Sequence, residues 1–496
     1  MGDLTRITSE KARKPRRAAT VVLRDGDDLL LVRRSAQQPF LGGFHGFPGG
    51  VVDRADVDLP ILGGDSGGLR AAALRELFEE TSILLTEPAI PPEEQRALWD
   101  RYDREGTGLE TLLEDSGLSL DARGMVPCGN WLTPPFSLRR FDTHFFLADV
   151  REKREISLRS PEIAGWEWMS AGDALARWRS LEMLLVPPTS ATLEAIEPGG
   201  SLAEIAERAL AQRGAHGEPT RRIEILEGIV LVPLQTRTLP PATHTNTILF
   251  GEGEMAVIDP APEDPDEQRV LFAMIDDLAV KGRSPSRILL THHHPDHVGA
   301  VQAARERYSI PVEAHQATID LLPGVTVDRA LQDGERIRLA GPRERILRAV
   351  HTPGHAPGHL AFLEEETRVL VAGDHVLGHG SVLVNPPHGD MDDYLASLET
   401  LRDLDAWILI GGHGAVVGDP AGLIGRYVDH RMARESAILG VLENGPATPQ
   451  TIVQKAYTDV STELRALAER SVLAHLIRLE KHGRARREGE IWRRAR

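Results

Sequence analysis

The chain has 496 residues, which at about 150 residues per domain indicates roughly three domains. It carries 57 Lys and Arg against 74 Asp and Glu, and this net charge of −17 argues against a surface that binds nucleic acid or anionic lipid throughout. A hydrophobic content of 41% and a charged content of 26% exclude wholesale disorder. Cys128 is the single cysteine, so a metal site must use histidines and carboxylates rather than a thiolate cluster.

The start of the chain is basic from Met1 to Arg17, and the apolar run that follows is too short for a secretory signal. We therefore expect a frayed N-terminal arm. No stretch approaches 18 consecutive apolar residues, so the sequence predicts no membrane-spanning helix and no membrane partner. The expected location is a reducing cytoplasm.

Three compositional units follow one another along the chain. The first begins with the strand-like runs Ala19–Leu23 and Leu29–Val32 and ends in a helical pattern at Ser201–Gln212. A polar segment rich in Gly and Pro then reads as a linker. Next, short apolar runs alternate with helical stretches, and the last part is helical and then basic. We predict an α/β and α+β multidomain chain with domains at 18–212, 223–430 and 431–496 and a linker at 213–222.

Two motifs in the first unit indicate a cation site, Phe47-Pro-Gly-Gly50 and Arg75-Glu-Leu-Phe-Glu-Glu80. The carboxylates of Glu76, Glu79 and Glu80 share one helical face because they stand at positions i, i+3 and i+4. Massed like charges are destabilising unless a cation neutralises them, and oxygen ligands suit Mg²⁺ or Mn²⁺.

These residues resemble the Nudix box. The resemblance implies an α/β/α sandwich that hydrolyses nucleoside diphosphates linked to another group, with Glu76, Glu79 and Glu80 as metal ligands and the first two as catalytic residues. Arg75, one helical turn before Glu79, is expected to hold its carboxylate in position. Two further segments resemble the subgroup that contains the coenzyme A diphosphatases: Asn130-Trp-Leu-Thr-Pro134 and Arg140-Phe-Asp-Thr-His-Phe-Phe-Leu147.

The first unit also departs from the box. Ser82 stands where the box has Gly, and Asp56 stands where it has Glu. Residues 57–74 number 18 instead of the usual seven, an insertion of 18 − 7 = 11 that we expect to loop out near residues 57–67. A retained scaffold with weakened activity is therefore an open alternative. A plain salt-bridged surface helix would explain neither the first motif nor the flanking strands.

The strongest motif of the chain lies in the second unit, Thr291-His-His-His-Pro-Asp-His297. In an extended segment, residues two apart project the same way, so His292 and His294 can bind one ion together. Imidazole suits zinc, and the neighbouring Asp296 and His297 suit a second divalent ion.

Candidate ligands recur wherever an apolar run of this unit ends. The four runs are Arg287–Leu290, Ile346–Val350, Val369–Ala372 and Trp407–Ile410. Each delivers one type of ligand beside a Gly or Pro that lets the backbone turn close to an ion. We predict one site from His292, His294 and His355, and another from Asp296, His297 and His413, with Asp374 bridging the two.

At these positions the chain resembles the metallo-β-lactamase superfamily. The resemblance implies an αββα sandwich, two zinc ions and a bridging hydroxide, with Asp296 also placed in catalysis. A water that bridges two Zn²⁺ ions has its pKa lowered toward neutrality, so no Ser or Cys nucleophile is needed. Four further histidines have weaker claims, with supporting or purely structural roles both open: His293, His351, His375 and His359, the last expected to reach the substrate.

The substrate of the second unit is left open by its ligands. Segments Gly373–Gly378, Asn385–Met391, Tyr394–Leu398 and Thr243–Phe250 resemble bacterial relatives of the β-lactamase-like-2 endoribonucleases. That resemblance implies cleavage of single-stranded RNA phosphodiesters. A thioester such as acyl-CoA is the alternative, because glyoxalase-type thioesterases share the same ligands. An RNA-binding regulator with a vestigial Nudix scaffold is a third hypothesis, which the full ligand set argues against.

The last unit has the element order of a winged helix. One helix begins at Tyr427–Glu435, a second at Thr448-Pro449, and a third spans Ser461–His482 before Gly483. Arg484–Arg494 then reads as a hairpin. On the third helix the expected buried residues are Leu464, Leu467, Val472, Leu476 and Leu479. The endoribonuclease family carries a winged helix at the same place.

The end of the chain is basic. From Arg478 to Arg496 there are eight Arg or Lys against three Asp or Glu. One interpretation is a phosphate-binding patch in which Arg478, Lys481 and Arg484 hold RNA near the zinc site. The alternative is a packing or dimerisation module with a solvated face, and in the second case the chain would form a homodimer.

Overall fold

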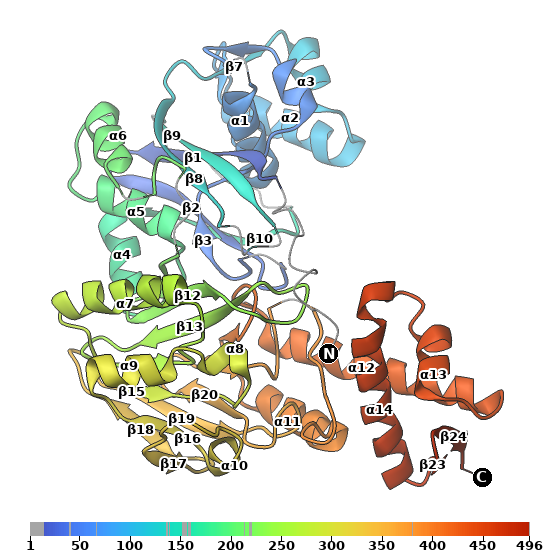
Figure 1. The fold of residues 1–496 in the computed structure, drawn as a ribbon. Helices are drawn as coiled ribbons and strands as arrows, with labels where there is room; N and C mark the ends of the chain where they lie inside the picture. Colours follow the sequence, from blue (N-terminus) through green and yellow to red (C-terminus); the bar gives the residue numbers. More distant parts are fainter. Residues whose placement is uncertain are drawn as a thin grey trace. The chain divides into compact units, whose positions relative to one another are not determined.

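The computed structural model describes residues 14–38, 41–65, 67–134, 137, 139–150, 156, 160–212, 214–217, 221–378 and 380–495. Most of the predicted N-terminal arm, residues 1–13, lies outside this set, whereas Arg16 and Arg17 already belong to the first strand. The chain divides into two compact units, residues 1–230 and 231–496 (Figure 1). No helix in the described ranges combines the length and the apolar character needed to cross a bilayer.

Unit 1 is built on a mixed sheet in the order β10-β2-β1-β9-β8. Its strands are β1 (Arg16–Asp25), β2 (Asp28–Arg34), β8 (Val126–Leu132), β9 (Phe141–Asp149) and β10 (Ile163–Ser170). The central strand β1 pairs with β9 in parallel, and its middle six residues are all buried. Ala19, Val21 and Leu23 of β1 pack in one core with residues of helix α1 (Leu69–Thr81). This packing places the acidic helix against the sheet.

The remaining elements of unit 1 are short strands and surface helices. They are β3 (His45–Gly46), β4 (Gly49–Val51), β5 (Ile61–Leu62), β6 (Thr86–Glu87), β7 (Ser119–Asp121), α2 (Pro92–Glu105), α3 (Leu109–Ser116), α4 (Ala171–Arg179), α5 (Pro187–Ile196) and α6 (Leu202–Leu210). The expectation that residues 57–67 simply loop out is wrong. Ile61 and Leu62 form β5 and pair in parallel with Leu120 and Asp121 of β7, which satisfies their backbone groups.

Two large sheets form the body of the described part of unit 2, apart from a two-stranded sheet near its C-terminus. From β12 onward the first large sheet has the order β12-β13-β14-β15-β16-β17, and the second has the order β18-β19-β20-β21-β22. The first-sheet strands are β12 (Ile229–Gln235), β13 (His244–Phe250), β14 (Glu254–Ile258), β15 (Ser284–Leu289), β16 (Val312–His315) and β17 (Arg329–Leu331). The second-sheet strands are β18 (Arg336–Leu339), β19 (Arg345–His351), β20 (Leu360–Glu364), β21 (Val369–Gly373) and β22 (Ile408–Gly411).

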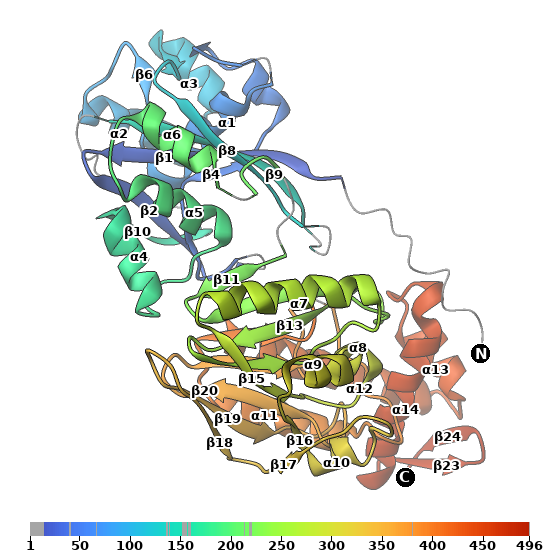
Figure 2. The ribbon, with the colours of Figure 1, turned by 60° about the vertical axis from the view of Figure 1, so that its left-hand side comes forward.

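Helices pack against both sheets of unit 2 (Figure 2). Helices α7 (Pro265–Val280) and α9 (Val301–Tyr308) contact β15 of the first sheet. On the second sheet, α11 (Met391–Asp403) buries Tyr394, Leu398 and Leu401 in a core shared with β21 and β22. Two single-turn helices, α8 (Pro295–Val298) and α10 (Gln316–Ile319), follow β15 and β16. The predicted αββα sandwich is confirmed.

The C-terminal part of unit 2 follows the predicted order of elements. It comprises α12 (Pro420–Glu443), α13 (Pro449–Ala456), α14 (Arg465–Lys481), β23 (Ala485–Glu488) and β24 (Ile491–Arg494). Thr448 caps α13, because its side chain accepts a hydrogen bond from the amide of Thr451. Buried Trp492 of the hairpin joins the core formed by these helices.

Two details of this part differ from the sequence prediction. Helix α12 begins at Pro420 rather than near Tyr427, because Asp419 caps it through the amide of Gly422 and Pro occupies the first turn. Residues 430 and 431, between which the domain boundary was predicted, lie inside α12, and the boundary itself stays a prediction. Leu464 and Leu467 are only half-buried, since Leu464 precedes α14 and Leu467 lies in its first turn, where the helix leaves the core.

Candidate active sites

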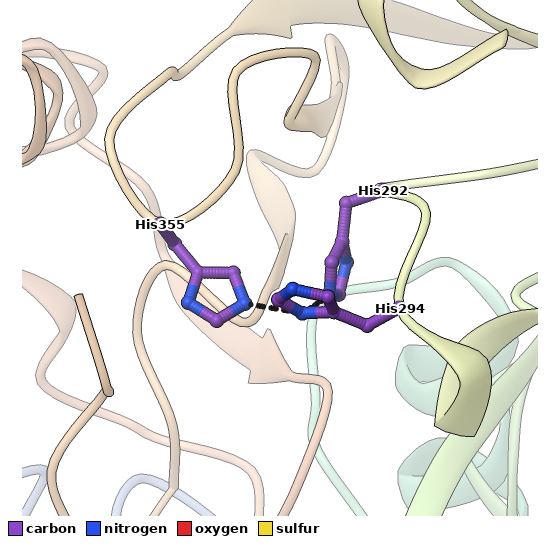
Figure 3. Close-up of side chains that lie close together, drawn as sticks. All are labelled: His292, His294 and His355. Atoms are coloured by element: carbon purple, nitrogen blue, oxygen red, sulfur yellow. Dashed lines mark hydrogen bonds between the residues drawn. The ribbon is translucent and has the colours of Figure 1, made fainter. Parts of the chain in front are cut away.

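Three imidazoles of unit 2 converge from two strand ends (Figure 3). His292 and His294 follow β15, and His355 follows β19. Nδ1 of His294 lies 2.9 Å from Nε2 of His292 and 3.0 Å from Nε2 of His355. Nitrogens bound at about 2.0–2.1 Å to one tetrahedral zinc ion are separated by roughly 3.4 Å. The three side chains predicted to share one ion are thus placed close to that spacing.

Hydrogen bonds to the outer nitrogens orient two of these rings. The Nδ1–H of His355 donates to the carbonyl oxygen of Leu383 at 2.9 Å, which leaves Nε2 with its lone pair facing the other imidazoles. Nδ1 of His292 lies 2.9 Å from the hydroxyl of Thr291. Burial lowers the pKa of His292 well below its ordinary value and that of His355 to about 3. Both are therefore neutral ligands at pH 7.

A second donor set lies beside the first. Asp296, His297 and His413 offer ligand atoms within 4.8 Å of one another. Asp374, at the end of β21, reaches both sets: its carboxylate oxygens lie 3.3 Å from Nε2 of His297, 3.3 Å from Nε2 of His413 and 3.9 Å from Nε2 of His355. The structure therefore brings the seven predicted ligands together, with Asp374 between the two sets.

The second set is buried and electrostatically unbalanced. Burial lowers the pKa of His297, but the carboxylates of Asp374 and Asp259 raise it well above its ordinary value. Among the described side chains, Nε2 of His297 and Oδ1 of Asp374 are buried without a hydrogen-bond partner. Buried polar atoms are rarely left unsatisfied, and a divalent cation between them would satisfy both. The residues present thus fit a metal at this position.

Glycine makes the close packing at Asp374 feasible. A Cβ at Gly412 would lie 2.3 Å from Oδ1 of Asp374 and 2.7 Å from a ring carbon of His297. Only a residue without a side chain fits there. Asn246 of β13 holds the same segment, because its amide group donates to the carbonyl oxygens of Gly411 at 2.9 Å and Gly414 at 3.0 Å.

Asp259 is a functional residue that the sequence reasoning missed. It follows β14, and its Oδ2 accepts hydrogen bonds from the hydroxyl of Thr291 at 2.6 Å and from Nδ1 of His297 at 2.8 Å. It therefore orients a predicted ligand of the second set and belongs to a third group with His292 and His297. The sequence did signal its position at a strand end, since the apolar run at residues 255–258 leads into this aspartate, but not its partner.

The four histidines with weaker claims lie around the donor sets. His359 is fully buried, with its ring centroid 5.3 Å from that of His292, and its contact with a substrate stays a prediction. His375 is also fully buried, and its Nε2 lies 3.2 Å from the carbonyl oxygen of Tyr394. His351 stacks on His315 at 4.1 Å. His293 is half-buried beside His294.

The three basic residues predicted to bind substrate face acidic partners. Arg478 bridges Asp392 of α11 and Glu435 of α12, Lys481 lies 3.1 Å from Asp392, and Arg484 lies 3.0 Å from Glu435. Arg478 is only 19% exposed, so it chiefly fastens α14 to α11 and α12. A role of these three side chains in substrate binding stays a prediction.

In unit 1, Arg75 gathers the acidic side chains of the predicted box. Its Nη1 lies 2.9 Å from the carboxylate of Glu76 and 2.8 Å from that of Glu79. The contact with Glu79 is the one that the sequence predicted. Its Nε lies 2.7 Å from Asp56, whose side chain is fully buried. Asp56, noted as a departure from the box, is therefore a direct partner of this guanidinium. The hydroxyl of Tyr102 donates to the other oxygen of Glu79 at 2.7 Å.

Glu76 and Glu80 lie deeper in unit 1. Burial, together with the neighbouring Glu76, raises the pKa of Glu80 to about 8, and burial raises that of Glu76 to about 7. The amide of Gly49 donates to Glu80 at 3.1 Å, and a Cβ at Gly50 would lie 2.4 Å from the Glu76 carboxyl group. The two glycines of the first motif thus let the backbone approach both carboxylates, a donor set that fits an oxygen-binding divalent cation.

Replacing Asp259 should weaken metal binding at the second donor set. In Asp259→Asn, Nδ1 of His297 loses a charged acceptor, and loss of such a partner typically costs about 10–100-fold in metal affinity. Zn²⁺ titration against a chromophoric chelator measures this, with exposed Asp277→Asn on α7 as the matched control. Unchanged affinity in Asp259→Asn would refute the orienting role.

The stability of unit 1 without divalent cations should fall as the pH rises from about 4.5 to about 8. Folding raises the pKa of Glu76 to about 7 and that of Glu80 to about 8, from an ordinary value of 4.5. Their contribution to stability is therefore fully present below pH 4.5 and is lost as the pH rises through 7 to 8. Calorimetry in EDTA measures the trend. Glu80→Gln should flatten this trend, whereas Glu110→Gln, at an exposed position of α3, should not. Mg²⁺ should raise the stability at the upper end of the pH range. A wild-type transition that stays constant or rises across this window contradicts the account.

Comparison with known proteins matches three family models to the chain: NUDIX domain at residues 14–184, Metallo-beta-lactamase superfamily at 240–413 and Beta-lactamase associated winged helix domain at 448–492. The Beta-lactamase-like protein 2 homolog of Caenorhabditis elegans is 30% identical over 244 residues, which cover 48% of this chain and 79% of the relative. That of Drosophila melanogaster is 31% identical over 255 residues, covering 49% and 84%.

Thioesterase pkgB of Emericella nidulans is 35% identical over 200 residues, covering 40% of this chain and 54% of the relative. Both hydrolase domain types imply divalent metal cofactors. The chain is therefore a metal-dependent hydrolase that belongs to the metallo-beta-lactamase superfamily, with the beta-lactamase-like protein 2 homologues among its relatives, and that carries a NUDIX domain before the metallo-beta-lactamase domain and a winged-helix domain after it.

Proposed function

We propose that unit 2 cleaves single-stranded RNA phosphodiesters with two zinc ions, and that unit 1 is a Nudix pyrophosphatase that uses Mg²⁺ or Mn²⁺. The observation that carries the hydrolytic part is the meeting of two donor sets at Asp374, which lies within 3.9 Å of ligand atoms from both. Two divalent cations held there supply a water nucleophile at neutral pH and polarise the oxygen of the scissile group.

The residues of the chain prepare this chemistry. Neutral imidazoles face the first ion position, and Asp296 and Asp374 add negative charge at the second. The outer nitrogens of His297, His355 and His413 are each held by an acceptor, so the rings do not need to reorient when the ions bind: these acceptors are the carboxylate of Asp259 and the carbonyl oxygens of Leu383 and His244.

RNA as the substrate is supported by the sequence resemblance to β-lactamase-like-2 endoribonucleases and by the basic hairpin. Arg486 is 66% exposed and its acidic partner Glu488 is 46% exposed, so this ion pair lies at the surface. Exposed ion pairs contribute only about 0–1 kcal/mol, so the guanidinium group of Arg486 can exchange its carboxylate partner for a phosphate. The winged-helix domain that carries Arg486 is part of unit 2.

A thioester is the second candidate substrate. The specific observation in its favour is the 35% identity to a relative whose name is Thioesterase pkgB. Dinuclear sites polarise a thioester carbonyl as readily as a phosphoryl oxygen, so the donor set does not discriminate between them. In this reading, unit 1 would cleave the diphosphate of coenzyme A while unit 2 hydrolyses an acyl-CoA.

The two candidates are separated by one comparison. Zinc-loaded protein is incubated with single-stranded RNA and with acyl-CoA, alongside Asp374→Ala and the exposed control Asp277→Ala. Wild type and control should cleave RNA, and Asp374→Ala should lose at least about 1000-fold of the rate because it removes the carboxylate shared by both sets. Thioester turnover without RNA cleavage would contradict the proposal and favour the second candidate.

The Nudix proposal has its own test. In Glu79→Gln the side chain keeps its size but loses the charge that Arg75 and a cation share, so cleavage of nucleoside-diphosphate-linked substrates under Mg²⁺ should fall by about 100-fold or more. Chromatography of coenzyme A and ADP-ribose digests measures the products, with Glu110→Gln as control. Equal product formation by wild type and Glu79→Gln would exclude this site as the catalyst.

A further inference from the structure

The loop of residues 380–386, between β21 and α11, contacts the first donor set of unit 2. The carbonyl oxygen of Leu383 in this loop accepts the Nδ1–H of His355 at 2.9 Å. Because a carbonyl oxygen only accepts, this bond fixes which nitrogen of His355 faces His292 and His294. The position of this loop therefore sets the direction of one predicted metal ligand.

Two side chains of α12 hold the first half of the loop. The hydroxyl of Tyr427 donates to the carbonyl oxygen of Gly380 at 3.1 Å, and Nη2 of Arg431 donates to that of Val382. Tyr427 and Arg431 are four residues apart, so they lie on one face of the helix. Arg431 is buried, with its guanidinium 5.2 Å from the ring centroid of Tyr394. Because packing fixes Arg431, the carbonyl oxygen of Val382, the residue before Leu383, is held in place.

A side chain of α14 holds the second half of the loop. Nε of Arg470 donates to the side-chain oxygen of Asn385 at 2.6 Å, and its Nη2 donates to the carbonyl oxygen of Pro386. A planar guanidinium that binds two acceptors at once restrains both their distance and their orientation. Helix α14 lies within the winged-helix domain, at residues 448–492. Hydrogen bonds from α12 and α14 therefore hold the loop on both sides of Leu383.

Helix α12 also reaches the second donor set, because the hydroxyl of Tyr427 accepts a hydrogen bond from the amide of Leu377 at 3.4 Å and the amide of Gly378 donates to the carbonyl oxygen of His413 at 2.9 Å. The described contacts of Arg470 in α14 are instead confined to residues 385 and 386 of the loop. His297 is held by Asp259 of the first sheet, and Nδ1 of His413 lies 2.8 Å from the carbonyl oxygen of His244, which opens β13. We infer that Arg470 is a positioning residue for His355, so that helix α14 of the winged-helix domain governs metal affinity at the first donor set and leaves the second unchanged. This inference rests on the two-metal part of the proposed function and not on the substrate.

The test is a metal titration of the full chain. In Arg470→Gln the loop loses its paired donor, and Zn²⁺ affinity at one of the two sites should fall about 10-fold, as for loss of a partner that orients a ligand. The other site should keep its affinity. Arg465→Gln, at the exposed start of the same helix, is the matched control and should leave both affinities unchanged. Arg470→Lys, which can still donate to Pro386, should recover part of the loss.

Hydrogen exchange of the metal-free protein supplies an independent readout. The amides of residues 380–386 should exchange faster in Arg470→Gln than in Arg465→Gln, while those of β14 and β15 should not change. Equal weakening of both metal sites, or unchanged affinities with a loosened loop, would overturn the inference. None of these measurements involves RNA or a thioester, so failure of the proposed substrate leaves their outcome intact.

Discussion

The architecture of unit 2 depends on a cluster of polar side chains that the fold removes from water. Strand ends of both sheets deliver His292, His355 and Asp374 to one place, where both rings are buried. The ligand atoms of these two histidines and of His294 all lie within 4.8 Å of one another. Burial of imidazoles and carboxylates is costly when their lone pairs face one another unsatisfied. A divalent cation removes this cost, and the surrounding hydrogen bonds already orient the ligands for it. Metal binding and folding of this region are therefore coupled.

Unit 1 meets a similar constraint by a different route. There the massed groups are carboxylates on one helix, and Arg75 compensates part of their charge through Glu76, Glu79 and Asp56. Glu80 is left in a buried position where the charged form is disfavoured without a cation. The aspartate that replaces the expected glutamate at position 56 still reaches Arg75, because the 3-10 turn at Arg54–Val57 brings it against α1.

Much of this arrangement could be predicted from the sequence because local patterns carry it. Strand geometry alone explains why His292 and His294, two residues apart, can bind one ion. The apolar runs that precede His355, Asp374 and His413 likewise predict strand ends without long-range information. The order of helices and hairpin after residue 420 follows from caps such as Thr448 and from Gly483.

The remainder depended on tertiary contacts. Asp259 lies 38 positions before its partner His297, and a single aspartate after a strand gives no sign of that partner. Arg478 and Lys481 form a basic run in sequence, but the fold places Asp392 of another helix beside both. A charge pattern on one helix does not reveal the charges on the helices that pack against it. For the same reason, the link from Arg470 through the loop to His355 is visible only in three dimensions.

The most direct measurement is the metal content of the purified, folded chain by plasma mass spectrometry, for wild type and His294→Ala. If the two donor sets hold separate ions, wild type should retain close to two equivalents of transition metal and His294→Ala close to one, since His294 belongs to a single set. Folded wild-type protein without stoichiometric transition metal would contradict the account, as would a variant that binds as much metal as wild type.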